Sequence, residues 1–136
     1  MKFVPYLNFN GTCAVAFRFY AELLGGKIVE STTFGETPAA EHVPDGWEDR
    51  VMHAVLAVGD QTIFGSDAPT ENYAKPQGAY VALLVDSPAE AERIYQALAE
   101  GGTVEMPLAE TFWAARFGML VDRFGTPWMI NCQQQQ

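Results

Sequence analysis

The chain has 136 residues, of which 49% are hydrophobic and 12% aromatic; this excludes a disordered chain and allows one folded domain. Its net charge of −9, with eight scattered lysines and arginines, disfavours nucleic acid because the phosphates would be repelled. No apolar run approaches the roughly 20 residues of a membrane span, and the N-terminus lacks a signal-peptide pattern. We therefore expect a cytoplasmic protein that binds no membrane.

The first half of the chain predicts a strand, a helix and three more strands. An alternating apolar run at residues 3–9 contains Pro5, so this strand should lie at a sheet edge or contain a bulge. Thr12 is a candidate N-cap for a helix over residues 13–24, which a Gly-Gly pair ends. The further strands are predicted at residues 27–34, 51–58 and 61–66, with a polar loop at 35–49 and a turn at 59–60.

The second half repeats this order after a linker at residues 68–77. Ser87, Pro88 and Glu90 have the spacing of a capping box with proline at the first helical position, so a helix should begin there and end near Glu100. The strands of this half are predicted at residues 79–85, 103–108, 117–121 and 127–132.

An internal repeat supports this division. A shift of 75 residues places Tyr20 on Tyr95 and Gly26 on Gly101, among six identities, and Gly59 matches Gly125 at an offset of 66. We therefore predict a single α+β domain of two βαβββ modules, about residues 1–67 and 78–132, whose curved mixed sheet encloses a cleft. Such sheets leave edges that dimerisation commonly covers, so we expect a homodimer.

Motifs along nearly the whole chain resemble one known family. The run VPYLNFNG at residues 4–11, the stretch ETFW at 110–113 and the run DRFGTPWMIN at 122–131 resemble the PhnB-like branch of the vicinal-oxygen-chelate (glyoxalase/bleomycin-resistance/dioxygenase) superfamily. The resemblance implies the glyoxalase-like fold. It also implies, for many members, a divalent metal held by His, Glu or Gln from the first and last strands of each repeat. Such a metal acts as a Lewis acid on neighbouring substrate oxygens.

The residues at those ligand positions do not suit a metal. Counted from the family motifs, the positions fall on Pro5, Ile63, Tyr80 and Met129. Proline, isoleucine and methionine do not hold a hard divalent ion, and one tyrosine does not make a site. We therefore expect no metal site and no cofactor.

Two functions stay open at this stage. One is a protein that binds a small molecule in an apolar cleft without metal, and the other is a metal-dependent enzyme of glyoxalase or dioxygenase type. A methyltransferase is not supported, because no glycine-rich nucleotide loop follows the first strand. No catalytic residue is identified.

Three more residues are candidates for the pocket wall. His53 lies in an apolar strand, where it is either a structural residue or a pocket histidine that binds or exchanges a proton. Phe112 and Trp113 lie in a predicted loop, and Trp113 is either a pocket wall or lid or a packing residue. The carboxylates of the loop at residues 35–49 are either a cation site or simply solvated.

Cys13 and Cys132 lie far apart in the sequence and lack a CxxC or histidine neighbour. In a cytosolic chain such cysteines are usually reduced thiols, and the sequence cannot show whether they meet.

Overall fold

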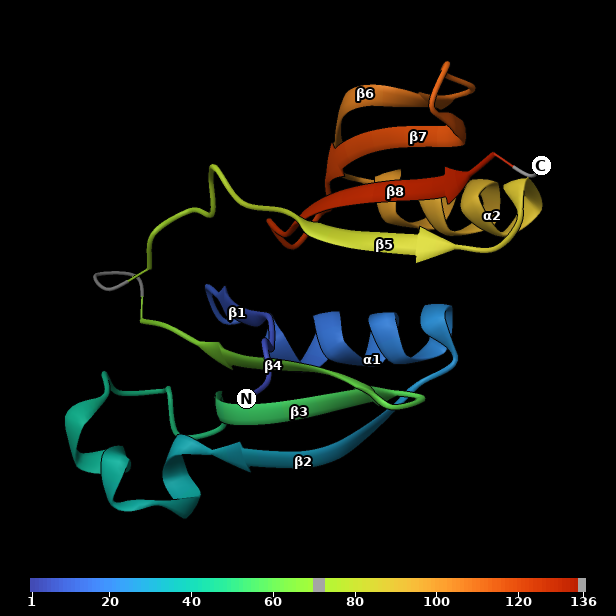
Figure 1. Cartoon of the computed structure of the whole chain (residues 1–136). Helices are drawn as coiled ribbons and strands as arrows, with labels where there is room; N and C mark the ends of the chain where they lie inside the picture. Colours follow the sequence, from blue (N-terminus) through green and yellow to red (C-terminus); the bar gives the residue numbers. More distant parts are fainter. Residues whose placement is uncertain (70–72, 135–136) are drawn as a thin grey trace. The chain divides into compact units, whose positions relative to one another are not determined.

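A computed structural model describes residues 1–69 and 73–134. The chain divides into two compact units, Met1–Ala74 and Lys75–Gln136, which we call the N-terminal and C-terminal units. Each contains one four-stranded sheet and one α-helix packed on it, so each has the predicted βαβββ order (Figure 1). The predicted linker at 68–77 includes residues 70–72, which lie outside the described residues.

In the N-terminal unit the strand order is β1-β4-β3-β2. Strand β1 pairs in parallel with β4, and the other neighbours are antiparallel. Because β1 lies at the edge, the expectation drawn from Pro5 is confirmed, although the strand begins one residue after this proline. The elements are β1 (Tyr6–Phe9), α1 (Cys13–Leu24), β2 (Lys27–Thr33), β3 (Val51–Val58) and β4 (Gln61–Asp67), with 3-10 turns η1 (Phe34–Glu36) and η2 (Pro38–His42) in the loop.

The C-terminal unit has the corresponding order β5-β8-β7-β6, again with one parallel edge pair, β5 with β8. Strand β7 begins at Ala114, so the loop predicted up to residue 116 is shorter than expected. Thr111 closes this loop, because its hydroxyl accepts a hydrogen bond from the Ala114 amide at 3.0 Å. The elements are β5 (Val81–Val85), α2 (Pro88–Ala99), β6 (Thr103–Ala109), β7 (Ala114–Val121) and β8 (Pro127–Gln133).

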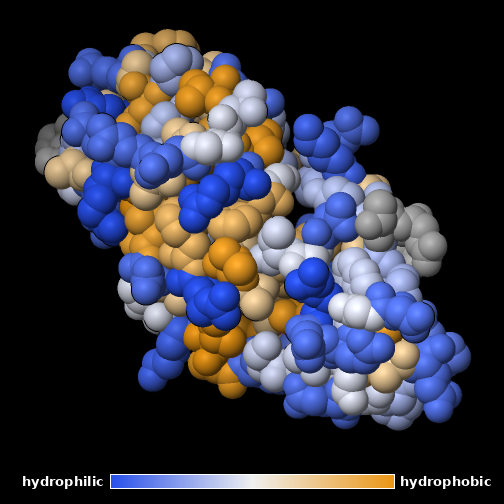
Figure 2. Space-filling model, turned by 180° about the vertical axis from the view of Figure 1, so that it is seen from behind, coloured by the Kyte–Doolittle hydropathy of each residue, from blue (hydrophilic) through white to orange (hydrophobic). Residues whose placement is uncertain are grey.

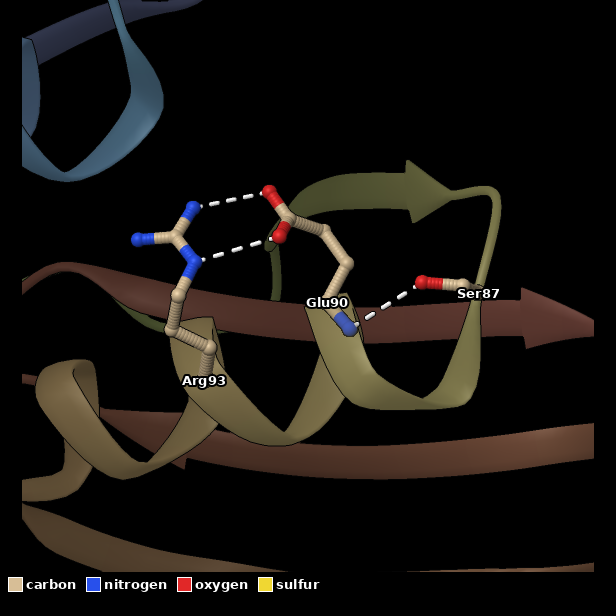
Figure 3. Close-up of polar contacts among 3 residues, drawn as sticks. All are labelled: Ser87, Glu90 and Arg93. Carbon is tan, nitrogen blue, oxygen red and sulfur yellow. Dashed lines mark hydrogen bonds and ion pairs between the residues drawn. The ribbon is translucent and has the colours of Figure 1, made fainter.

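The two helices begin differently. Ser87 caps α2 through its hydroxyl, which accepts from the Glu90 amide at 3.2 Å, and Pro88 is the first helical residue as predicted (Figure 3). The carboxylate of Glu90 binds Arg93 at 2.7 Å rather than completing a capping box. Thr12 is at the N-cap position of α1, but its side chain makes no capping hydrogen bond.

A buried carboxylate takes the capping role at α1. Asp67, at the end of β4, accepts hydrogen bonds from the amides of Cys13 and Val51, each at 2.9 Å. This aspartate therefore joins the start of the helix to the start of β3. No local sequence signal reveals this role of Asp67, because the contact with Cys13 joins residues 54 positions apart.

The structure shifts the internal repeat by one residue in the strands. Tyr6 pairs with Phe64 in the first sheet, and Ala82 pairs with Met129 in the second. Bulges follow Ile28 in β2 and Val104 in β6, which are 76 residues apart rather than 75. Three residues join β1 to α1 and two join β5 to α2, whereas two join α1 to β2 and three join α2 to β6. The helices therefore keep the offset of 75, and the strands on either side of them have an offset of 76. A single offset therefore cannot align both strands and helices.

No helix among the described residues is long and apolar enough to cross a membrane.

Candidate functional site

In each unit the helix covers one side of the sheet, and glycine contacts show which side. A methyl group at Gly65 would lie 2.6 Å from Cζ of Phe17 on α1, and one at Gly118 would lie 2.7 Å from Cε2 of Tyr95 on α2. Successive side chains alternate between the two sides of a strand. The side of Gly65 and of Gly118 therefore shows on which side the neighbouring residues of β4 and β7 lie, and the strand pairing extends this to the strands beside them. We call the opposite side of each sheet its helix-free face.

The helix-free face of the N-terminal unit carries a cluster of three rings. His53 on β3 lies edge-on to Phe64 on β4, with ring centroids 5.3 Å apart. Tyr6 on β1 lies 6.1 Å from His53 and 6.4 Å from Phe64. Half of the Tyr6 surface is exposed, at 50%, so the cluster offers an accessible aromatic surface. We call these three residues the ring cluster.

Polar groups border the ring cluster on the same face. Ser66 on β4 lies opposite Asn8 on β1, and its hydroxyl donates a hydrogen bond to the Asn8 side-chain oxygen at 3.2 Å. Among the described residues His53 makes ring contacts and no hydrogen bond, so its two ring nitrogens are available to a ligand. His53 therefore lies on the helix-free face beside both rings and polar groups, and its pocket role stays a prediction.

The helix-free face of the C-terminal unit combines thioether, alkyl and aromatic side chains with the amide of Asn131. Met129 on β8 lies opposite Met119 on β7, and Phe117 on β7 lies opposite Asn131. Phe117 and Asn131 were not predicted as site residues, because only the strand register shows that they share this face.

An aromatic chain leads from this face to the β6–β7 loop. The Trp113 ring lies 5.5 Å from that of Phe117 and 4.8 Å from that of Phe112. Trp113 is 49% exposed and Phe112 is 90% exposed, so neither is a core packing residue. Figure 2 shows apolar surface gathered in patches among polar and charged side chains rather than spread evenly.

The remaining predicted residues lie elsewhere. Pro5 precedes β1, and Ile63 lies on the helix side of β4, where it pairs with the fully buried Leu56. Tyr80 precedes β5 and donates a hydrogen bond from its hydroxyl to Glu105 at 2.9 Å; this bond raises the pKa of Tyr80. Of the four predicted cleft positions, Met129 is the one that lies within a described strand and on its helix-free face.

For Pro5 and Ile63 the difference is a shift of one residue along the strand. Taking Met129 as the reference, the register gives Phe64, Tyr6 and Ala82 as the equivalent residues on the helix-free faces. These replace Ile63, Pro5 and Tyr80 as the residues at the first and last strands. A slip of one residue, as from Ile63 to Phe64 and from Pro5 to Tyr6, moves a position to the opposite side of the sheet. Tyr80 and Ala82 are two residues apart, so that change moves the position along the chain into β5.

The corrected positions do not suit the divalent metal of the resemblance. Tyr6, Phe64, Ala82 and Met129 provide a phenol, a benzene ring, a methyl group and a thioether, which are not a donor set for a hard cation. No group of three His, Cys, Asp or Glu side chains that could hold a metal occurs within residues 1–69 and 73–134. The residues present therefore do not fit the metal.

In the acidic loop at residues 35–49, one carboxylate is already hydrogen-bonded within the loop. The Glu36 carboxylate accepts hydrogen bonds from the amide and hydroxyl of Thr33, at 3.0 and 2.8 Å, and these bonds lower the pKa of Glu36. This carboxylate therefore caps the turn η1, which gives it a structural role. His42, at the end of η2, is exposed.

Both cysteines are buried free thiols. Burial, with the charge of Asp67 as a smaller contribution, raises the pKa of Cys13 to about 12. A thiol that stays protonated is a poor nucleophile, so Cys13 is a packing residue.

Comparison with known proteins places this geometry in a family. The family model of the Glyoxalase/Bleomycin resistance protein/Dioxygenase superfamily matches residues 3–130. The chain belongs to this superfamily. It is also 36% identical over 144 residues to protein YjdN of Escherichia coli K12, covering all of this chain and 98% of that protein.

Two solved structures illustrate the likeness within the superfamily. The crystal structure of protein PA1353 from Pseudomonas aeruginosa is 48% identical, with a TM-score of 0.87 and 99% of each chain covered. A PhnB protein from Bacillus cereus, described as a putative 3-demethylubiquinone-9 3-methyltransferase, is 24% identical with a TM-score of 0.82, covering 97% of this chain and 99% of that chain. At that identity the second likeness shows the shared glyoxalase-like fold alone.

Proposed function

We propose that this superfamily member binds a small, largely apolar organic molecule on the helix-free faces of its sheets without a bound metal. One observation carries the proposal. Where the resemblance implies metal ligands, the helix-free faces have aromatic, methyl and thioether groups at Tyr6, Phe64, Ala82 and Met129. Such groups gain free energy by contact with an apolar ligand and give nothing to a cation.

The ring cluster is the best candidate for the contact surface in the N-terminal unit. Aromatic rings prefer edge-to-face or offset contacts at centroid distances of about 4.5–7 Å, and a planar ligand can extend the arrangement of Tyr6, His53 and Phe64. His53 adds one polar group, which can donate or accept a hydrogen bond and so orient the ligand.

Binding and metal content test the proposal together. Full-length protein should be expressed in medium containing zinc, manganese, nickel and iron and purified without chelator. We expect far less than one equivalent of metal, and chemical-shift changes at the ring cluster when small aromatic compounds are added. Tightly held metal in stoichiometric amount would instead support the metal-dependent enzyme of glyoxalase or dioxygenase type.

A matched pair of variants locates the site. Phe64→Ala removes a ring of the cluster and should weaken binding by about three- to tenfold, because a lost aromatic contact costs about 0.5–1.5 kcal/mol. Phe19→Ala removes a ring from α1, on the other side of the sheet, and should leave the affinity unchanged. Equal losses in the two variants would place the ligand elsewhere.

A further inference from the structure

One buried polar atom in the C-terminal unit lacks a partner. The side-chain oxygen Oδ1 of Asn131 is shielded from solvent and accepts no hydrogen bond from any residue that the structure describes. Asn131 lies on the helix-free face of β8, between Leu84 on β5 and Phe117 on β7. Both neighbours are apolar, so the sheet itself offers the amide oxygen no side-chain donor.

The internal repeat shows what this position looks like when it is satisfied. Ser66 on β4 corresponds to Asn131, since each stands two residues after the matched pair Phe64 and Met129. In the N-terminal unit Ser66 lies opposite Asn8, and the two side chains hydrogen-bond to each other at 3.2 Å. The residue opposite Asn131 is Leu84, so the partner present in one unit is missing in the other.

A buried acceptor without a donor destabilises the folded protein, and such groups are rare in native structures. A ligand that donates a hydrogen bond removes this penalty as it binds. We propose that the helix-free face of the C-terminal unit binds a neutral aromatic molecule that donates one N–H or O–H hydrogen bond to Oδ1 of Asn131. This inference rests on the proposed function and names the ligand's chemical class.

The surroundings of Asn131 define that class further. Leu84, Phe117 and Met129 are apolar, and burial of a charged ligand against them would cost more than one hydrogen bond returns. The aromatic chain from Phe117 through Trp113 offers ring edges and faces to a flat ligand. Phenols and indole-type heterocycles combine one donor with such a flat apolar body.

Matched probes separate the hydrogen bond from apolar contact. Indole and 1-methylindole, like phenol and anisole, differ chiefly in the presence of the donor. With full-length protein we expect the donor compound of each pair to bind about three- to tenfold more tightly, the range that one net hydrogen bond gives. The side-chain amide resonances of Asn131 should shift with the donor compounds only.

Two variants assign the preference. Asn131→Leu should bring the affinity ratio of each pair close to one, while Gln96→Leu, which removes an exposed amide on α2, should leave the ratio unchanged. A ratio near one in the wild-type protein, with both compounds bound, would overturn this inference and leave the proposed function standing. Failure of all four compounds to bind at millimolar concentration would overturn both.

A measurement without ligand tests the unpaired oxygen directly. Asn131→Leu should leave the urea unfolding midpoint unchanged or raise it, because no hydrogen bond is lost. Leu84→Asn copies the residue found opposite Ser66 and should raise the midpoint while lowering the preference for donor compounds, because the amide oxygen gains an internal partner. A clear fall of the midpoint in Asn131→Leu would show that the oxygen is already paired, and would refute the inference.

Discussion

The motif at residues 122–131, which carries much of the family resemblance, has a structural explanation at the level of single residues. The Asp122 carboxylate is buried and accepts hydrogen bonds from the amides of Phe124 and Thr126 and from the indole nitrogen of Trp128, at 2.9 to 3.0 Å. One side chain therefore closes the β7–β8 turn and anchors the largest buried side chain. The sequence showed the motif but not that its aspartate points inward.

Replacing this carboxylate tests its role. Asp122→Ala leaves three donors without their acceptor, and we expect the free energy of unfolding to fall by about 3 kcal/mol. Asp60→Ala, in the exposed turn of the other unit, should change it by less than about 0.5 kcal/mol. Urea unfolding of both variants is the measurement, and similar midpoints would contradict the assignment.

Cys13 predicts a specific pH dependence. Its folded-state pKa is raised to about 12, whereas an unfolded cysteine has a pKa of about 8.5. Above about pH 9 the unfolded chain therefore ionises and the folded chain does not, so stability should fall toward pH 12 by up to about 1.4 kcal/mol per pH unit.

The comparison with Cys13→Ala isolates this effect. Unfolding measured from pH 7 to 11 should show a smaller decline above pH 9 in the variant than in the wild type, and identical slopes would contradict the raised pKa. At pH 8, alkylation of Cys13 should proceed no faster than the protein unfolds, since the thiol is buried and protonated.

At the level of elements, glycine sets the distance between helix and sheet. Gly65 on β4 lies under Phe17 of α1, and Gly118 on β7 lies under Tyr95 of α2. The Tyr95 hydroxyl donates to the backbone oxygen of Met106 at 2.9 Å, which fixes its ring over the sheet. Phe17 is almost fully buried in this contact.

Filling one of these positions should be costly unless the ring above is reduced. Gly65→Ala brings a methyl group within 2.6 Å of Phe17, and we expect a loss of about 1–3 kcal/mol in unfolding free energy. Combining it with Phe17→Leu should cost less than the sum of the two single changes, as residues in contact are coupled. Additive losses in a double-mutant cycle would argue against the contact.

For the whole molecule, the sequence predicted the fold well and the site positions less well. Helical periodicity, glycine stops and the repeat identified the eight strands and two α-helices that the structure describes, because these signals are local. The side of the sheet that a residue occupies depends on register, and an error of one residue exchanged Phe64 for Ile63. Likewise, no local signal shows that Ser66 has a polar partner and Asn131 an apolar one.

The edges of the sheets support the expected homodimer as a prediction at this scale. The outer strands β2 and β6 have exposed apolar side chains at Val29, Val104 and Met106, and edge strands leave backbone groups available for pairing. Light scattering coupled to gel filtration should give twice the chain mass of 15.0 kDa. A mass of one chain at micromolar concentration would contradict the prediction.

Gly65 and Gly118 also indicate which positions of the protein should tolerate substitution. Gly65 on β4 pairs with Ala54 on β3, and in the other unit Gly118 on β7 pairs with Ile130 on β8. In each unit one glycine of such a pair therefore lies beneath an aromatic ring of the helix. On the helix-free faces, in contrast, His53 and Phe117 occupy the same place, as do Ser66 and Asn131. The tight contact of glycine with an aromatic ring limits substitution on the helix side, whereas the helix-free side chains have no helix above them. A library confined to the helix-free faces should yield folded proteins with new ligand preferences.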